Sequence, residues 1–240
     1  MKTAQVEPIV ALDVSARADA EAMVRRLGDA CDFYKVGLEL FSAEGPAVVA
    51  WLRGEGKRVF VDLKLHDIPN TVRGAARSVA RLGASLLTVH ASGGREMIAA
   101  AVAGAAEGSA ETDTDCGILG VTILTSMDAS GVEQAWGRQS VTVLDEVGRL
   151  AGLVVEAGGA GIVCSGHEAA AVRDRHGDRL GLLIPGIRLP GGEAHDQRRV
   201  MTPADAAQAG ARWLILGRAV TAAADPAEAM GQVRSQLAAL

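Results

Sequence analysis

Residues 57–91 read KRVFVDLKLHDIPNTVRGAARSVARLGASLLTVHA and contain two strand-like segments separated by one helix-like segment. The first segment, 57–65, and the last, 86–91, are short apolar runs of the kind that form buried strands. The stretch between them, 70–82, is longer and amphipathic, which is typical of a surface helix. Strand, helix and strand in this order predict a βαβ unit with two parallel strands.

The same alternation extends in both directions from this unit. Further strands are expected at residues 8–14, 33–40, 117–124, 161–165, 180–187 and 213–217, and further helices at 18–30, 45–54, 94–106, 141–157, 167–175, 203–209 and 226–240. Eight parallel strands in a chain of 240 residues favour a single-domain (β/α)8 TIM barrel over residues 1–240. An open doubly wound sheet is the alternative, but no G-x-G-x-x-G follows the first strand. The acidic stretch 107–115 is expected to be an exposed loop.

Composition narrows the class of protein. Hydrophobic residues make up 49% of the chain and aromatic residues only 3%, so the core is expected to be aliphatic. A net charge of -5 disfavours a nucleic-acid partner. The three cysteines are scattered without a C-x-x-C pair, which indicates a reducing compartment. No apolar segment has the length of a signal peptide core or a membrane span. We therefore expect a cytoplasmic protein without a membrane partner.

Charged residues interrupt three apolar strands close to their carboxyl ends. Asp62 and Lys64 are two positions apart in VFVDLKLHD, so they project from one face of a strand, about 6.6 Å apart along it. Lys35 in FYKVG, Asp13 in ALDV and Asp67 after the third strand complete the set. A structural salt bridge would explain one pair, and a lone aspartate often caps a helix. Five charges at the active-site end of a barrel indicate a catalytic cluster instead.

A second polar region follows the seventh and eighth strands, where barrels often bind phosphate. The long segment IPGIRLPGGEAHDQRRVMTP (184–203) carries Arg188 and Gln197, and LGRAV (216–220) carries Gly217 and Arg218. Glycine lets backbone N–H groups approach a ligand, and arginine supplies a forked donor. A loop of this length is also a candidate lid.

Other residues at the strand ends are less specific. Thr125 and Ser126 in LTSM place hydroxyls after the fifth strand, but a helix cap or a turn would explain them equally well. His90 ends the fourth strand and either faces the barrel mouth or is structural. The sequence has no histidine pair at metal-binding spacing, no G-x-S-x-G and no Walker A motif. These absences disfavour a metal centre, a serine hydrolase and a P-loop hydrolase.

The motifs together resemble the bacterial form of the orotidine 5'-phosphate decarboxylase family. The resemblance rests on Lys35 in FYKVG, on the D-x-K-x-x-D of VDLKLHDIPNTV, and on ALDV, VHASGG, VTILTSM, VCSGHEA, PGIRLPGGEAHDQRRVMTP and LGRAVT. The D-x-K-x-x-D pattern alone is shared with hexulose-phosphate synthases and keto-gulonate-phosphate decarboxylases. Its combination with LTSM and DQRR is much more specific.

The resemblance implies decarboxylation of orotidine 5'-monophosphate to uridine 5'-monophosphate, the last step of pyrimidine nucleotide synthesis. It implies no metal, no cofactor, and a homodimer with shared active sites. By position, Asp62, Lys64 and Asp67 would be catalytic together with Lys35, and Asp13 and Lys35 would hold the ribose hydroxyls and help to order these charges. The remaining positions that it assigns are Asp67 with Thr71 for the partner subunit's site, Thr125 and Ser126 for the pyrimidine, and Arg188, Gln197, Gly217 and Arg218 for the phosphate.

Two alternatives remain at this point. The first is a Mg²⁺-dependent lyase or decarboxylase of the same barrel superfamily that acts on a sugar phosphate, with Glu39 at the end of the second strand as an additional metal ligand. The second is a non-catalytic barrel that binds a phosphorylated ligand. It would need Arg218 but not the cluster of lysines and aspartates.

Overall fold

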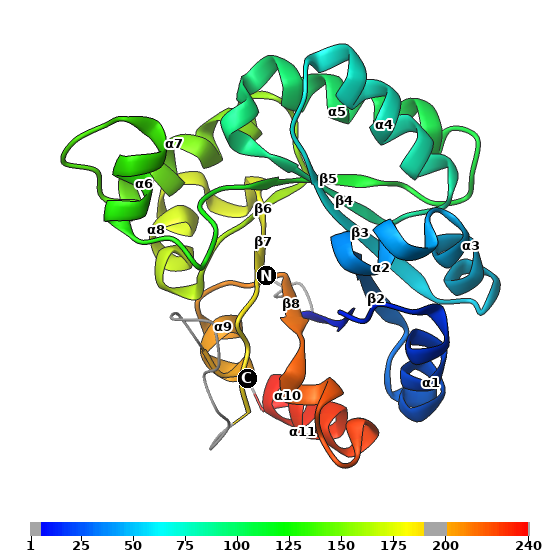
Figure 1. Cartoon of the computed structure of the whole chain (residues 1–240). Helices are drawn as coiled ribbons and strands as arrows, with labels where there is room; N and C mark the ends of the chain where they lie inside the picture. Colours follow the sequence, from blue (N-terminus) through cyan, green and yellow to red (C-terminus); the bar gives the residue numbers. More distant parts are fainter. Residues whose placement is uncertain (1–5, 190–200, 240) are drawn as a thin grey trace.

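The computed structural model describes residues 6–189 and 201–239, and its eight strands form one closed parallel barrel in sequence order (Figure 1). The register pair Glu7↔Trp213 joins the first strand to the last and closes the barrel. The (β/α)8 prediction is therefore confirmed. The strands are β1 Glu7–Leu12, β2 Phe33–Gly37, β3 Arg58–Leu65, β4 Leu86–His90, β5 Gly117–Val121, β6 Gly161–Val163, β7 Gly181–Ile184 and β8 Trp213–Leu216.

Helices surround the strands, as Figure 1 shows. They are α1 Arg17–Leu27, η1 Gly28–Ala30, α2 Leu38–Glu44, α3 Ala47–Gly54, α4 Pro69–Arg81, η2 Ala91–Gly93, α5 Gly94–Ser109, α6 Ala129–Trp136, α7 Val143–Glu156, α8 Gly166–His176, η3 Gly177–Arg179, α9 Pro203–Gln208, α10 Arg218–Thr221 and α11 Pro226–Ala238. Helices α2, α6 and α10 lie at positions where the sequence had not indicated a helix. Within 6–189 and 201–239, no helix combines the length and the apolar character needed to cross a membrane.

Three strands stop three residues earlier than expected, and one of them is β7, which ends at Ile184. Strand β2 ends at Gly37, and β5 ends at Val121. Each of these two ends where a neighbouring strand supplies no further backbone partner, since the last register pairs are Leu12↔Val36 and Val121↔Val163. A strand beyond that point would leave its hydrogen-bonding groups unpaired on one side. The chain therefore turns into α2 after β2 and into a turn after β5.

The lumen of the barrel is apolar near the amino ends of the strands and polar further along. The apolar layer consists of Ile9, Phe33, Phe60, Leu86, Leu119, Leu183 and Trp213. Successive residues of a strand point to opposite faces, so the lumen positions two residues further along β2, β3 and β4 are Lys35, Asp62 and Thr88. Neighbouring residues such as Tyr34 and Val61 pack in the larger core that includes the helices. The strand period thus carries charged groups into the barrel.

The acidic stretch 107–115 is not entirely a loop, because α5 continues through Ser109. Glu107 lies on this helix and forms ion pairs with Arg73 and Arg77 of α4, and Glu111 pairs with Arg81. These arginines are four residues apart and therefore lie along one face of α4. The stretch thus links two neighbouring helices, and the prediction of a loop was wrong for its first three residues.

Candidate active site

Four of the predicted charged residues form one chain of alternating charge at the carboxyl ends of the first three strands. Lys35 Nζ lies 2.8 Å from Asp13 Oδ1 and 3.7 Å from Asp62 Oδ2. Lys64 Nζ lies 2.9 Å from both carboxylate oxygens of Asp62. The order Asp13, Lys35, Asp62, Lys64 gives each cation an anionic neighbour, so the structure brings these four residues together as expected. We call this set the charged chain.

Burial makes the members of the charged chain depend on one another. The exposed fraction of the side chain is 10% for Lys35, 13% for Asp62 and 29% for Lys64. Burial alone raises the pKa of Asp62, but the charges of Lys64 and Lys35 and hydrogen bonds from Lys64 and Thr88 outweigh it and hold that pKa below its ordinary value. The Asp62 carboxylate is therefore ionised at neutral pH, and it compensates the two ammonium groups.

Gly37 leaves the space that the charged chain occupies. A Cβ atom at this position would lie 2.8 Å from Lys35 Nζ and 3.4 Å from Asp13 Oδ1. The backbone of Gly37 is extended, with φ of -92° and ψ of -177°, so the absence of a side chain matters here rather than backbone freedom. Sequence reasoning missed this residue. The two-residue period from Phe33 and Lys35 to Gly37 was the available signal.

Strand β4 contributes two further residues to the site. Thr88 is fully buried, and its hydroxyl donates a hydrogen bond to Asp62 Oδ1 at 2.8 Å. His90 lies 5.4 Å from His66 between ring centroids. Burial lowers the pKa of His90, and the charges of His66 and Lys64 lower it further, against an opposing effect of Asp62. His90 therefore lies within electrostatic range of Lys64 and Asp62, on the same side of β4 as Leu86 and Thr88. Sequence reasoning missed Thr88, although it is two residues from Leu86 in the lumen layer.

Asp67 and Thr71 form no ion pair with the charged chain within the described part of a single chain. Both residues are exposed, and the Asp67 carboxylate accepts a hydrogen bond from the backbone N–H of Ile68 at 2.6 Å. In the part of the chain that the structure describes, no ion pair joins Asp67 to Lys64. The neighbouring Ile68 side chain is 67% exposed, which is unusual for a large apolar residue.

Arg188 and Arg218 follow β7 and β8 at the same end of the barrel. Arg188 is buried, and its Nη1 donates to the carbonyl oxygen of Ile187 at 2.9 Å. Burial lowers the pKa of Arg188, and the positive charge of Arg218 lowers it further, so the two guanidinium groups lie close enough to repel each other. Gly217 is the N-cap residue of α10 and directly precedes Arg218. The structure therefore brings three of the four predicted phosphate-site residues to adjacent strand ends.

The fourth, Gln197, lies outside the described residues. The residues on either side of the segment that contains Gln197 are hydrogen-bonded to each other. Ile187 and Met201 form an isolated parallel bridge, and the Arg188 N–H donates to the Met201 carbonyl at 2.9 Å. The long segment therefore starts and ends at one point of the barrel rim.

Thr125 and Ser126 lie in a turn after β5. The Met127 N–H donates to the Leu124 carbonyl at 2.9 Å and closes this turn. The N-cap of α6 is Asp128, whose side chain accepts from the Gly131 N–H at 3.0 Å. Thr125 and Ser126 thus lie in a turn that backbone groups close, and neither residue caps α6.

Glu39 is not where the metal-dependent alternative requires it. It lies exposed in the first turn of α2 rather than at the end of β2, because β2 ends at Gly37. Among residues 6–189 and 201–239, no three or more His, Cys, Asp or Glu side chains are grouped so that they could hold a metal ion.

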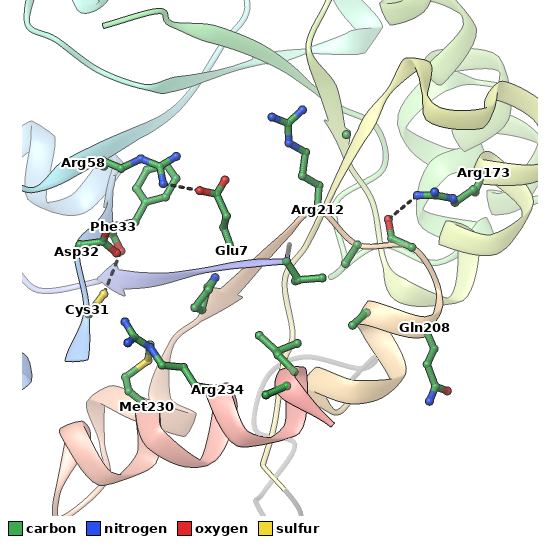
Figure 2. Close-up of a pocket in the computed structure, with 18 of the residues that line it drawn as sticks. Glu7, Cys31, Asp32, Phe33, Arg58, Arg173, Gln208, Arg212, Met230 and Arg234 are labelled. Atoms are coloured by element: carbon green, nitrogen blue, oxygen red, sulfur yellow. Dashed lines mark hydrogen bonds and ion pairs between the residues drawn. The ribbon is translucent and has the colours of Figure 1, made fainter. Parts of the chain in front are cut away.

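A cavity of about 1360 Å³ opens at the opposite, amino-terminal end of the strands. Glu7, Phe33 and Arg58 line it, and Figure 2 shows Arg58 directed at Glu7. Trp213 Nε1 donates to Glu7 Oε2 at 2.9 Å, and Arg58 lies 4.1 Å above the Phe33 ring, so these groups close the end of the barrel. Active sites of such barrels lie at the other end. The charged chain therefore marks the candidate active site.

Comparison with known proteins agrees with this geometry. Residues 7–233 match the model of the Orotidine 5'-phosphate decarboxylase / HUMPS family. The chain belongs to this family. The matched range of the orotidine 5'-phosphate decarboxylase / HUMPS family includes the charged chain, Arg188 and Arg218. The resemblance inferred from the sequence motifs is confirmed.

Individual members of the family are similar over nearly the whole chain. The orotidine 5'-phosphate decarboxylase of Paramagnetospirillum magneticum is 48% identical, over 97% of this chain and 99% of that protein. The one from Moorella thermoacetica is 45% identical, over 95% of this chain and 91% of that protein. The crystal structure of the Lactobacillus acidophilus orotidine 5'-phosphate decarboxylase superposes with a TM-score of 0.87 at 33% identity, covering 97% and 99% of the two chains.

Proposed function

We propose that this protein decarboxylates orotidine 5'-monophosphate to uridine 5'-monophosphate, the last step of pyrimidine nucleotide synthesis. Membership of the family supports the reaction. The observation that carries the proposal is the charged chain, which holds the Lys64 ammonium beside an ionised Asp62 at the barrel mouth. The non-catalytic alternative gives no reason for two partly buried lysines in this position.

The chemistry requires a cation at one carbon atom. When the bond between C6 and the carboxylate breaks, CO2 leaves and its electron pair stays on C6 in the plane of the ring, where the π system cannot delocalise it. Lys64 supplies a positive charge at that carbon and then transfers a proton to C6. Lys64 regains its proton from water before the next turnover. This combines electrostatic stabilisation with general-acid catalysis.

One lysine does not account for the whole acceleration. A unit charge pair at about 4 Å contributes roughly 4 kcal/mol at an effective dielectric constant near 20. Enzymes generally lower the barrier by about 8–23 kcal/mol. We assign part of the remainder to Asp62, whose charge repels the substrate carboxylate until CO2 leaves. Another part comes from phosphate binding, because remote binding energy can be used at the reacting centre.

The phosphate subsite is proposed to comprise Arg188, Gln197, Gly217 and Arg218. The closeness of two guanidinium groups supports it, since a phosphate dianion between them would relieve their repulsion. The long segment between Arg188 and Met201 would then close over the bound phosphate as a lid. The pyrimidine is assigned to Thr125 and Ser126, and the ribose hydroxyls are assigned to Asp13 and Lys35.

The proposal includes a cytoplasmic homodimer without metal or cofactor, in which residues 1–240 of each chain form one domain. Asp67 and Thr71 would complete the partner subunit's site and act beside its charged chain. Their exposure supports this role, as does the exposed Ile68 between them. In a dimer this patch would be covered, and the Asp67 carboxylate would come near a lysine.

The proposed reaction is tested by adding purified protein to orotidine 5'-monophosphate, with and without EDTA, and following the fall in substrate absorbance. We expect conversion to uridine 5'-monophosphate at the same rate in both. No conversion by folded protein would reject the proposed reaction. Loss of activity with EDTA would instead favour the metal-dependent alternative.

The shared site is tested by mixing two inactive variants, Lys64→Ala and Asp67→Ala, with different affinity tags. If Asp67 acts in the partner's site, hybrid dimers contain one intact site and activity returns. Hybrid dimers recovered through both tags without activity would show that Asp67 acts within its own chain.

A further inference from the structure

The backbone of Lys64 has an unusual conformation for a non-glycine residue. Its φ is +51°, and Ser140 is the only other non-glycine residue with positive φ in the part of the chain that is described. L-residues rarely occupy this left-handed region, and the cost is accepted mostly at functional sites. The surroundings of Lys64 must therefore favour this conformation over a regular strand.

The conformation coincides with a break in the pairing of β3 with β4. The register pairs are Val61↔Leu87 and then Leu65↔Val89. Asp62, Leu63 and Lys64 thus lie opposite the single residue Thr88, and β3 bulges at this point. The bulge lets the Lys64 side chain fold back onto Asp62, where a regular strand would keep the two side chains about 6.6 Å apart along its axis.

Thr88 fills the gap in the pairing with its side chain. Its Oγ1 accepts a hydrogen bond from the Lys64 backbone N–H at 3.0 Å and donates one to Asp62 Oδ1 at 2.8 Å. The residue is fully buried, so water does not compete for either bond. One hydroxyl therefore satisfies a backbone group that the bulge leaves unpaired and also orients the carboxylate that holds Lys64 Nζ.

We infer that Thr88 is a positioning residue for decarboxylation, which fixes the left-handed backbone of Lys64 and the orientation of Asp62 so that the ammonium is aimed at the reacting carbon. This inference rests on the proposed function. Without the hydroxyl, the Lys64 N–H is left unsatisfied, and Lys64 can relax toward a regular strand. Because Cβ changes direction with φ, the ammonium would then move away from its place beside Asp62.

The role predicts a change in the titration of Asp62. The titratable groups near its carboxylate are Lys35 from β2 and Lys64 from β3, with His90 of β4 within electrostatic range and Asp13 beyond Lys35. Removing the Thr88 hydroxyl leaves these groups in place but removes one hydrogen bond to the ionised form. The pKa of Asp62 is therefore expected to rise.

Three substitutions separate positioning from a purely structural role. Thr88→Val keeps the shape and removes the hydroxyl, Thr88→Ser keeps the hydroxyl, and Thr88→Cys provides a near-isosteric weak donor should the valine variant not fold. Thr122→Val is the matched control, because the Thr122 hydroxyl is also buried but donates to a backbone carbonyl, that of Val163, at 2.8 Å.

In Thr88→Val we expect kcat to fall on the order of 10²-fold, as for a reacting group displaced by about 1 Å. KM should change much less, because the buried Thr88 hydroxyl is bonded to Lys64 N–H and to Asp62 Oδ1 and acts through these two residues. The acid limb of the kcat profile should move to higher pH. Thr88→Ser should restore kcat and the profile, Thr88→Cys should lie between, and Thr122→Val should lose stability without a comparable loss of kcat.

Two results would overturn the inference. One is unchanged kcat and pH profile in a folded Thr88→Val or Thr88→Cys variant. The other is a set of kcat values that follow the melting temperatures rather than the hydroxyl. The carboxyl ¹³C titration of Asp62 by NMR needs no substrate, so it tests Thr88 even if the parent fails to turn over orotidine 5'-monophosphate. An unchanged Asp62 titration in the valine variant would count equally against the role.

Discussion

Lys64 Nζ lies at the same distance, 2.9 Å, from both carboxylate oxygens of Asp62, although the two residues are only two positions apart in one strand. The bulge in β3 makes this geometry possible. Because both side chains are largely shielded from water, each charge depends on the other, and a change at either one affects both stability and chemistry.

Lys64→Ala is expected to abolish turnover of orotidine 5'-monophosphate while leaving the fold intact, because it removes both the cation and the proton donor. Lys57→Ala is the matched control. Lys57 lies at the other end of the strand, where its ammonium donates to the Gly28 and Cys31 carbonyls. Turnover is followed by absorbance, and folding by circular dichroism. Near-parental turnover by Lys64→Ala would contradict the mechanism.

Asp62→Asn is expected to change how stability depends on pH. The pKa of Asp62 is lowered in the folded protein, so the carboxylate stabilises the fold above its unfolded pKa of about 3.9, and this contribution is lost as pH falls through the folded value. The variant should be less stable than the parent at neutral pH, with a difference that shrinks below about pH 4. Urea unfolding from neutral to acid pH measures this difference.

Asp174→Asn serves as the control for that series, since Asp174 lies exposed on α8. A gap between parent and Asp62→Asn that stays constant with pH would show that the lowered pKa of Asp62 does not contribute to stability.

Gly37→Ala is expected to reduce kcat/KM by roughly tenfold or more through displacement of a positioned group. Its methyl group would lie 2.8 Å from Lys35 Nζ and force the ammonium away from Asp13. Gly54→Ala at the end of α3 is the control, because its methyl group would meet no atom within 4 Å. Steady-state kinetics with melting curves separates the two effects. Equal activity of both variants would show that Lys35 adapts without loss.

Arg218→Ala is expected to raise KM for orotidine 5'-monophosphate by about 10- to 100-fold. The reason is that it removes a charge-assisted hydrogen bond to the phosphate, which contributes roughly 1.5–3 kcal/mol to binding. Activity toward orotidine, which lacks the phosphate, should change little. Arg212→Ala is the control, because it removes an exposed arginine just before β8, at the other end of the barrel. It should change neither the KM for orotidine 5'-monophosphate nor the activity toward orotidine. Parental affinity for the phosphorylated substrate in Arg218→Ala would show that the phosphate binds elsewhere.

Gly104→Ala is expected to destabilise the protein by about 1–3 kcal/mol through overpacking. Its methyl group would clash with the Arg73 carbonyl oxygen of α4. Gly152→Ala in α7 meets no atom within 4 Å and should stabilise by about 0.5–1 kcal/mol, as alanine does within a helix. Thermal unfolding should therefore shift in opposite directions. An unchanged or raised melting temperature in Gly104→Ala would show that α4 and α5 can separate without cost.

The sequence by itself determined the barrel and the set of charges at its mouth. Both follow from patterns that repeat over a few residues of the chain. Alternating strands and helices specify the parallel barrel, and the two-residue strand period carries Lys35 and Asp62 into its lumen. The same period was sufficient to indicate Gly37 and Thr88, which the sequence analysis missed because neither carries a charge. The roles of Gln197 and of the other predicted site residues stay predictions.

Only the tertiary structure decided how these groups meet. The contact between Thr88 and Asp62 joins residues 26 positions apart. The left-handed backbone of Lys64 coincides with a register shift in which one residue of β4 lies opposite three residues of β3. The approach of Arg188 to Arg218 and the exposure of Asp67 are likewise set by packing between elements. A local period fixes which face a side chain occupies. It does not fix the register between strands, because that depends on hydrogen bonds formed between distant parts of the chain.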